Sequence, residues 1–386
     1  MYNNTNGEAL IAVAQNRNTA NVSNTTPKQD KYDIYWDRNG KEIYRKVNNQ
    51  PKDRTFIVKT TRIFDDVYKD YLDAVNSRFK TEAERKQQIA DDKVNGVYPP
   101  SVLNIPIEAA KKVEKAIKNG TLSGTVKYSI TVTNSTTNIP VTTNHTIKIE
   151  DSIVEIENIE MFLDMYLIAI NDDGKGGTKP TNNQEYGGLI SFDDVITQVI
   201  GHVASPKTQL AAEIQYPVLS TTRSIFHTHP SGDIEEIVGY EDKIMTKTTY
   251  KQKYHFHYPP SYIDTYNFSG DYPNYVFSRG SEKSVYVYNG KGVLAIFPSN
   301  RISSYQNDVQ KDEMKELEED QKAEKKKQEE QHKKEKSGDS SEATKQRHKK
   351  EKDAMNEKQK NEKDAMKQKH ENESKPTVIT ATPPTP

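Results

Sequence analysis

Lys311 to Glu371 is the stretch that most limits where this chain can build a core. Its 61 residues include 19 basic and 18 acidic side chains, a near-balanced mixture. Its large aliphatic side chains are Met314, Leu317, Met355 and Met366. So few apolar residues cannot sustain the seam of a coiled coil. We expect an exposed helix that carries ion pairs and is broken near Ser337 and Gly338, with disorder as the alternative.

Both chain ends are too polar to bury a core, so the foldable region is confined to about Lys31–Ser304. Within this region the density of apolar residues rises near Ile159, where a densely apolar segment begins. The expected parts are a polar Asn- and Thr-rich terminus (1–30), an α+β accessory region (31–157), a second domain (158–304), a charged helical or disordered tail (305–375) and a disordered Thr- and Pro-rich end (376–386).

Composition excludes several classes of function. The net charge is −1, so no basic field favours nucleic acid as a partner. Cysteine is absent, which rules out disulfides and thiolate zinc sites, so any metal must bind His, carboxylate or water. No apolar run approaches the ~20 residues of a membrane span. Met1–Pro27 lacks the features of a signal peptide, so we expect cytoplasmic synthesis and, if the protein is secreted or injected, a leaderless route.

The hydrophobic pattern predicts a mixture of helices and strands, an α/β protein of the α+β kind. Apolar residues recur at helical spacing over Phe64–Phe79, and a second helix is predicted at Ile107–Lys118, before Asn119 and Gly120. A third, densely apolar helix begins at Ile159. Strands are predicted at 32–36, 42–44, 55–59, 126–132, 139–149, 184–190, 195–201, 211–216, 222–228, 276–278, 285–288 and 293–297.

The segment Ser224–Pro230 carries the most specific chemical signal. It reads as a strand that ends in His227-Thr228-His229-Pro230. Residues two apart in a strand point to the same face, so the two imidazoles stand side by side, roughly 7 Å apart at Cα. Both can reach one ion, and zinc bound by two histidines normally takes a carboxylate as its third protein ligand.

Two other elements supply carboxylates. Glu185 stands in Glu-Tyr-Gly-Gly-Leu, where the glycines allow backbone or a ligand to approach closely. Asp264 stands in Ser261-Tyr-Ile-Asp264, which follows two prolines. Each element also has an ordinary interpretation: packed imidazoles, a strand-edge acid, and a helix capping box. Capping and metal ligation are compatible, because an Asp in the first helical turn faces outward from the helix end.

Taken together, these three elements resemble the JAMM motif of JAB/MPN metalloproteases, in the order in which that family has them. The resemblance covers roughly Ile159–Ser304 and implies a mixed sheet flanked by helices. It also implies Zn²⁺ held by His227, His229 and Asp264. The tyrosine-rich hairpin that follows and the Asp53–Phe56 stretch are similar to JAB-like toxin modules of bacterial polymorphic toxins.

The resemblance also implies catalytic roles for two residues. Glu185, outside the metal's ligand set, would take a proton from water and pass it to the leaving amine. Ser261 would donate a hydrogen bond to the oxyanion that develops on the attacked carbonyl. We therefore expect a zinc-dependent peptidase or isopeptidase, deployed as an effector or toxin module. Its expected partners are a protein or peptide substrate and an immunity or delivery protein.

The chain departs from the family in one respect. About thirty residues separate the two metal-binding histidines from Ser261-x-x-Asp264, whereas the family has a short separation. Asp242 is nearer the usual spacing and remains a rival third ligand, although it lacks a Ser three residues earlier. The pair His255 and His257 lacks an apolar approach strand and a following Pro, so we expect lid, substrate-contact or surface residues there.

Two alternative functions remain. The first is a metal-free JAB-like scaffold or interaction protein whose working part is the charged helix. Such a scaffold needs neither Glu185 nor the two histidines, so their presence counts against it. The second is a DNA-associated, RadC-like protein, which Pro230-Ser231-Gly232 suggests and the neutral charge disfavours.

Overall fold

The computed structural model describes residues 11–12, 31–96, 98–133, 138–205, 214–216, 220–243, 246–255, 258–267, 270–280, 283–338 and 341–373. Contacts divide these residues into two compact units, with the boundary between Arg301 and Ile302. Both helices and strands occur in the larger unit, which confirms the expected mixed α and β class.

A four-stranded sheet forms the first layer of the larger unit. Its order is β3-β2-β4-β7. These strands are β2 (Lys31–Trp36), β3 (Glu42–Asn48), β4 (Arg54–Val58) and β7 (Ile153–Ile156). Helix α3 (Ile107–Lys118) packs on this sheet through Val113 and Ile117, which share a buried cluster with Tyr35 and Val58. The exposed hairpin of β5 (Thr125–Thr133) and β6 (Pro140–Lys148) follows.

Two further helices lie between β4 and α3 in the chain. Helix α1 (Phe64–Arg78) follows the expected stripe, and Val67, Tyr71 and Val75 are buried. Helix α2 (Glu82–Val94) is not predicted by the sequence pattern, because it is too polar to show an apolar stripe. A capping box does mark its start, since Thr81 accepts from the Glu84 N–H while the Glu84 carboxylate accepts from the Thr81 N–H.

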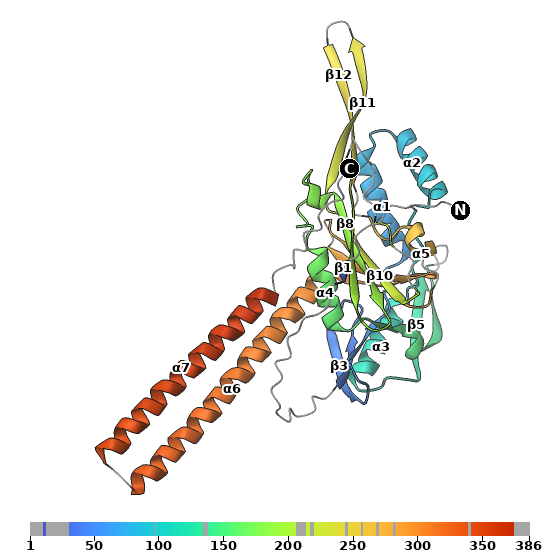
Figure 1. Ribbon diagram of the computed structural model, residues 1–386. Coiled ribbons are helices and arrows are strands. Elements are labelled where there is room, and N and C mark those ends of the chain that lie inside the picture. The colour runs from blue at the N-terminus through green and yellow to red at the C-terminus, as the bar shows by residue number, and fades with distance from the viewer. Residues whose placement is uncertain are drawn as a thin grey trace. The chain divides into compact units, whose positions relative to one another are not determined.

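A seven-stranded mixed sheet forms the centre of the unit, in the order β1-β9-β8-β10-β13-β14-β15. Its strands are β1 (Ile11–Ala12), β8 (Gln184–Ser191), β9 (Ile196–Val203), β10 (Thr222–His229), β13 (Asn274–Ser278), β14 (Ser284–Asn289) and β15 (Gly292–Pro298). Within this sheet, the described strands pair antiparallel except for β10 and β13, which pair in parallel. Helix α4 (Ile159–Ala169) contacts β8 and β10 and buries Phe162 and Met165 (Figure 1).

The first sheet packs closely against the end of the second. The Trp36 ring meets Phe297 edge-on, with ring centroids 5.7 Å apart. The Thr60 N–H donates to the Leu294 carbonyl, and the Leu103 N–H donates to the Val293 carbonyl. These contacts cover the free edge of β15, which would otherwise expose unpaired backbone groups.

A long hairpin is inserted between β10 and β13. Strand β11 (Asp233–Lys243) pairs antiparallel with β12 (Thr246–His255) (Figure 1). Its first register pair is Asp233 with His255, so the hairpin returns to the place where it begins. Helix α5 (Tyr262–Asn267) follows and starts where Ser261-x-x-Asp264 predicts a helix.

The prediction of a strand at 211–216 is wrong for the three described residues, 214–216. Ile214, Gln215 and Tyr216 form no regular element, because Tyr216 turns its hydroxyl onto the Phe226 carbonyl instead of joining a ladder. The rest of the predicted 211–216 strand lies outside the described residues. So do most of the expected polar N-terminus and the whole Thr- and Pro-rich end.

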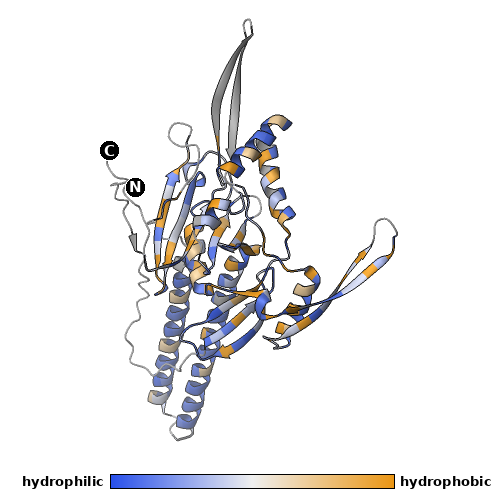
Figure 2. Cartoon of the chain, turned by 90° about the vertical axis from the view of Figure 1, so that its right-hand side faces the viewer, coloured by the Kyte–Doolittle hydropathy of each residue, from blue (hydrophilic) through white to orange (hydrophobic). Residues whose placement is uncertain are grey.

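The smaller unit is built from two antiparallel helices. These are α6 (Asn300–Gly338), which continues past the expected end of the core, and α7 (Glu342–Glu373). Figure 2 shows both as mainly hydrophilic. Lys358, Lys363 and Lys369 of α7 pair with Glu324, Glu318 and Glu313 of α6. The break at Ser337–Gly338 and the ion pairs are as expected, whereas the pairing of the two helices is not predicted.

Across the described part of the chain, none of the helices combines the length and the apolar character needed to cross a membrane.

Candidate metal centre

Strand β10 places His227 and His229 on one face of the central sheet. His227 pairs with Gly187 of β8 on one side and with Val276 of β13 on the other. The side chains of His227 and His229 are 4% and 10% exposed, so both are held away from bulk water. The strand period brings them together as expected.

The carboxylate of Asp264 lies close to the Nε2 atoms of both histidines, and these two atoms also lie close to each other. The Nε2 atoms of His227 and His229 lie 3.2 Å apart. Oδ1 of Asp264 lies 3.2 Å from Nε2 of His227, and Oδ2 lies 3.6 Å from Nε2 of His229. Two imidazole nitrogens and one carboxylate therefore converge on one point, a donor set that could hold a metal ion.

The tautomer of His229 follows from its other ring nitrogen. Nδ1 of His229 lies 2.5 Å from the main-chain carbonyl oxygen of Tyr258, which can only accept. Nδ1 therefore carries the proton in the neutral ring, and Nε2 presents a lone pair toward Asp264. Nδ1 of His227 is buried and has no hydrogen-bond partner in the described part of the chain.

Ser261 and Asp264 form a reciprocal cap at the start of α5. The N–H and Oγ–H of Ser261 donate to Oδ2 of Asp264 at 2.6 and 2.8 Å. The Asp264 N–H donates back to Ser261 Oγ at 3.2 Å. The same carboxylate thus caps the helix and faces the histidines. In this arrangement the Ser261 hydroxyl proton is directed at Asp264.

Glu185 lies on the neighbouring strand, on the same face. Glu185 lies two residues before Gly187, the register partner of His227, so it shares the strand face of Gly187, and its charge acts on His229. Glu185 is half-buried. Burial alone would lower the pKa of His229, but the hydrogen bond and charge of Asp264, followed by the charge of Glu185, raise it above its ordinary value.

The charges of the site also act on Asp264 and on a buried tyrosine. Burial would raise the pKa of Asp264, but His227 and His229 hold it well below its usual range. Burial, followed by the charges of Asp264 and Glu185, raises the pKa of Tyr288 well above its ordinary value. The Tyr288 hydroxyl is fully buried and has no hydrogen-bond partner among the described residues. Sequence reasoning did not single out Tyr288.

The two glycines after Glu185 are required by close approach. A Cβ at Gly187 would lie 2.2 Å from the Phe226 carbonyl oxygen and 2.8 Å from the Tyr216 hydroxyl. A Cβ at Gly188 would lie 2.7 Å from the Thr197 carbonyl oxygen. The expected close approach is therefore present, and the approaching groups are the neighbouring strands and the Tyr216 hydroxyl, which donates to the Phe226 carbonyl.

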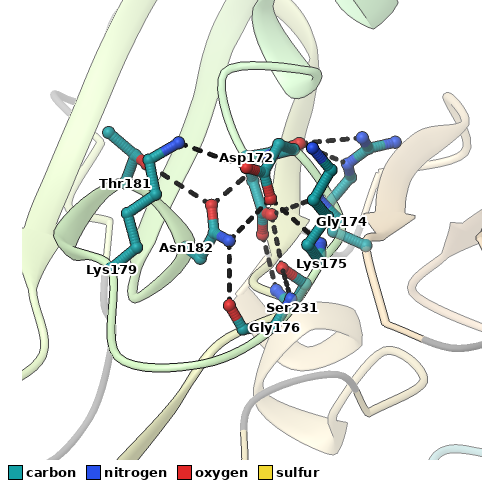
Figure 3. Close-up of polar contacts among 10 residues, drawn as sticks. Asp172, Gly174, Lys175, Gly176, Lys179, Thr181, Asn182 and Ser231 are labelled. Carbon is teal, nitrogen blue, oxygen red and sulfur yellow. Dashed lines mark hydrogen bonds and ion pairs between the residues drawn. The ribbon is translucent and has the colours of Figure 1, made fainter.

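A buried hydrogen-bond network fixes the chain directly after His229 (Figure 3). The Ser231 N–H and hydroxyl donate to the two carboxylate oxygens of Asp172, both at 2.5 Å. The Arg279 guanidinium donates to the Asp172 carbonyl, and the Arg279 N–H donates to the His229 carbonyl. Sequence reasoning missed this support, because Asp172 lies about sixty residues before Ser231.

The rival residues lie elsewhere or outside the described part. Asp242 belongs to β11, where it pairs with Lys247, and its side chain is outside the described residues. His255 ends β12, and His257 is not among the described residues. No other carboxylate joins the two histidines in the described part of the chain.

Comparison with known proteins adds no relative. No protein-family model matches the chain, and no match was found among curated proteins or solved structures. The function is therefore inferred from the residues and their geometry.

Proposed function

We propose that the protein is a zinc-dependent peptidase or isopeptidase of the JAMM type. One observation carries this proposal: both histidine Nε2 atoms and the Asp264 carboxylate point at one position, with Glu185 on the adjacent strand. Neither a packed pair of imidazoles nor a helix cap requires the carboxylate of a separate helix to meet two histidines of one strand beside an acid on the next strand.

The geometry fits zinc. With zinc–ligand bonds of about 2.0–2.1 Å and tetrahedral angles, two ligand atoms stand about 3.3 Å apart. The Nε2 atoms lie 3.2 Å apart, and Asp264 Oδ1 is 3.2 Å from Nε2 of His227. Nδ1–H of His229 points at the Tyr258 carbonyl, the kind of outer partner that orients a metal-binding imidazole. Three protein ligands leave a fourth position for water or substrate.

The roles of the side chains follow from their positions. A zinc ion bound there would lower the pKa of water toward about 7 and polarise a substrate carbonyl. The Glu185 carboxylate accepts the proton of that water and transfers it to the leaving nitrogen. The Ser261 hydroxyl turns from Asp264 to donate to the developing oxyanion, while the Ser261 N–H continues to hold Oδ2.

The long separation between His229 and Asp264 is compatible with this assignment. The inserted residues form a hairpin whose ends, Asp233 and His255, are a register pair. The chain therefore re-enters the site close to where it left, as a short connection would. This supports Asp264 as the third ligand over Asp242.

We further propose that the peptidase acts as an effector or toxin module on a protein or peptide substrate. The similarity of Asp53–Phe56 and of the tyrosine-rich hairpin to JAB-like toxin modules supports this. A scaffold that uses the charged helices is the competing function, and it requires no metal at His227.

The test combines metal content with catalysis. His227→Ala and His229→Ala should each hold one zinc fewer per chain than wild type, by elemental analysis, while circular dichroism stays unchanged. Glu185→Gln should keep the zinc and lose about 10²–10⁴-fold in cleavage rate on a panel of peptide and isopeptide substrates.

The carboxylate variants provide the matched comparison. Asp264→Asn should shed zinc during dialysis against a weak chelator, because an amide replaces an anionic ligand. Asp242→Asn should behave like wild type. A folded wild type that binds no zinc at these histidines would refute the proposal, and the reverse behaviour of the two Asp variants would move the third ligand to Asp242.

A further inference from the structure

The helical unit contains a second cluster of metal-binding residue types. His332 of α6 and His348 and Glu351 of α7 each offer one ligand atom, and these atoms lie within 4.8 Å of one another. The two imidazoles stack in parallel across the helix pair, with ring centroids 3.9 Å apart and planes 11° apart. The cluster therefore forms only when α6 and α7 are paired.

Each histidine has its own carboxylate from the opposite helix. Nε2 of His332 lies 2.8 Å from Oε2 of Glu351, and Nε2 of His348 lies 2.8 Å from Oε2 of Glu335. His348 is 5% exposed, in a unit whose surface is otherwise charged. Its Nδ1 atom is buried and has no hydrogen-bond partner in the described part of the chain. A buried, unsatisfied nitrogen in such a position is costly unless something binds it.

Elsewhere along α6 and α7, other kinds of contact join the two helices. Elsewhere the helices are joined by Lys–Glu pairs, and by Gln321 and Gln359, which each donate to the carbonyl of the other. Nε2 of His370 also lies 2.9 Å from a carboxylate oxygen, Oε2 of Glu313, but no second histidine joins this pair among the described residues. Two histidines and two acids gather only around His332 and His348 among the described residues of this unit.

We propose that His332, His348 and Glu351 bind a divalent ion of the zinc class between α6 and α7. Imidazole and carboxylate are ligands that suit such borderline ions, and Glu335 is placed to orient His348 from outside the ligand set. Because ligands come from both helices, the ion binds the paired state and not the separated helices. The site is independent of the peptidase centre, and its presence does not depend on the proposed function.

Arg347 gives the proposal a distinctive consequence. Its guanidinium contacts Glu335 and also lies 3.7 Å from Glu351, so it already supplies positive charge at the carboxylates. A metal ion bound to Glu351 must share that carboxylate with the Arg347 guanidinium. Removing this cation should therefore strengthen metal binding, whereas a purely structural role for the cluster predicts only a weaker helix pair.

The experiment uses the full-length chain with His227→Ala and His229→Ala, so that the first centre does not contribute. Titration with zinc chloride, followed by calorimetry, should show one zinc per chain. Adding His332→Ala and His348→Ala should remove this binding or weaken it more than about tenfold. His370→Ala is the matched control, because it breaks a similar interhelical His–Glu contact, and it should leave zinc binding unchanged.

Three further measurements keep the test decisive. In the otherwise wild-type chain, His332→Ala with His348→Ala should lower the zinc content by one per chain, whatever the peptidase centre does. Arg347→Gln should lower the zinc Kd. At a zinc concentration of 100 times the Kd, the ratio of paired to unpaired helices should rise about 100-fold, read as slower tryptic digestion. Zinc content that is the same with and without the two histidines, in both backgrounds, would overturn the proposal.

Discussion

Nδ1 of His229 donates to the main-chain carbonyl of Tyr258, 2.5 Å away and 29 residues later in the sequence. This contact joins the end of strand β10 to the segment that follows β12. Because Asp233 and His255 are the first register pair of the inserted hairpin, the contact lies at the base of that hairpin. The insertion therefore lengthens the chain without separating the two ends that build the site.

The first prediction concerns this hairpin. Replacing residues 235–253 by an Asn-Gly turn should preserve zinc binding at His227 and His229, because the base of the hairpin and the Tyr258 contact remain. Zinc content and near-ultraviolet circular dichroism provide the measurement. Loss of zinc would show that the hairpin holds the ligands in place.

The second prediction separates two roles of Ser261. Ser261→Ala should lower kcat about 10²–10³-fold if its hydroxyl stabilises the oxyanion. Zinc content should change little, because the main-chain N–H at this position still donates to Oδ2 of Asp264. Ser261→Thr retains a hydroxyl and should recover part of the rate. If Ser261→Ala loses zinc while the remaining loaded enzyme keeps its kcat, the hydroxyl only positions Asp264.

The third prediction tests the network that fixes the chain after His229. Asp172→Asn should destabilise the fold by about 1–3 kcal/mol, because a buried acceptor of two Ser231 donors becomes an amide. Zinc should also dissociate faster, since Ser231 is two residues from His229. Asp173→Asn is the control: its carboxylate is more exposed and contacts Asn182 and Lys179, so the loss should be smaller. Urea unfolding and zinc release to a chelator measure both effects.

The fourth prediction concerns the charged tail. Ending the chain at Asn307 should leave the proposed peptidase activity and the proposed zinc site at His227 intact, because His227, His229 and Asp264 all lie within the larger unit. Total zinc should nevertheless fall by one per chain, since the truncation removes His332 and His348. Aggregation of the truncated chain, or loss of both ions, would show that the helices support the core.

Local periodicity was enough to predict most of the helices and strands, but not the long hairpin of β11 and β12. The stripe of Val67, Tyr71 and Val75 marked α1, alternation marked β5, and the Asn289-Gly290 turn marked the hairpin of β14 and β15, because each pattern depends only on neighbours in sequence. Helix α2 escaped prediction because its residues are largely polar, and Thr81 and Glu84 were the signal that could have identified it. The pairing of α6 with α7 depends on contacts between polar residues that are distant in sequence. Such contacts cannot be predicted from the pattern of apolar residues.

The candidate site was likewise predictable from local sequence patterns only in part. His227 and His229 stand together by strand period, and the Ser261–Asp264 cap is a local pattern. The support from Asp172 and the burial of Tyr288 beside the charges of the site arise only in the folded chain. Sequence reasoning could name the acids and histidines, but it could not find the groups that hold or surround them.

The parallel pairing of β10 with β13 has a consequence for the order of assembly. A parallel pair requires a crossover connection, and Asp264 lies on that crossover while His227 lies on the strand before it. The imidazole pair is therefore set once β8 and β10 have joined, whereas the carboxylate arrives only after a longer loop has closed. During refolding, zinc uptake should lag behind the appearance of sheet structure, and this delay should measure the time that the crossover needs to dock.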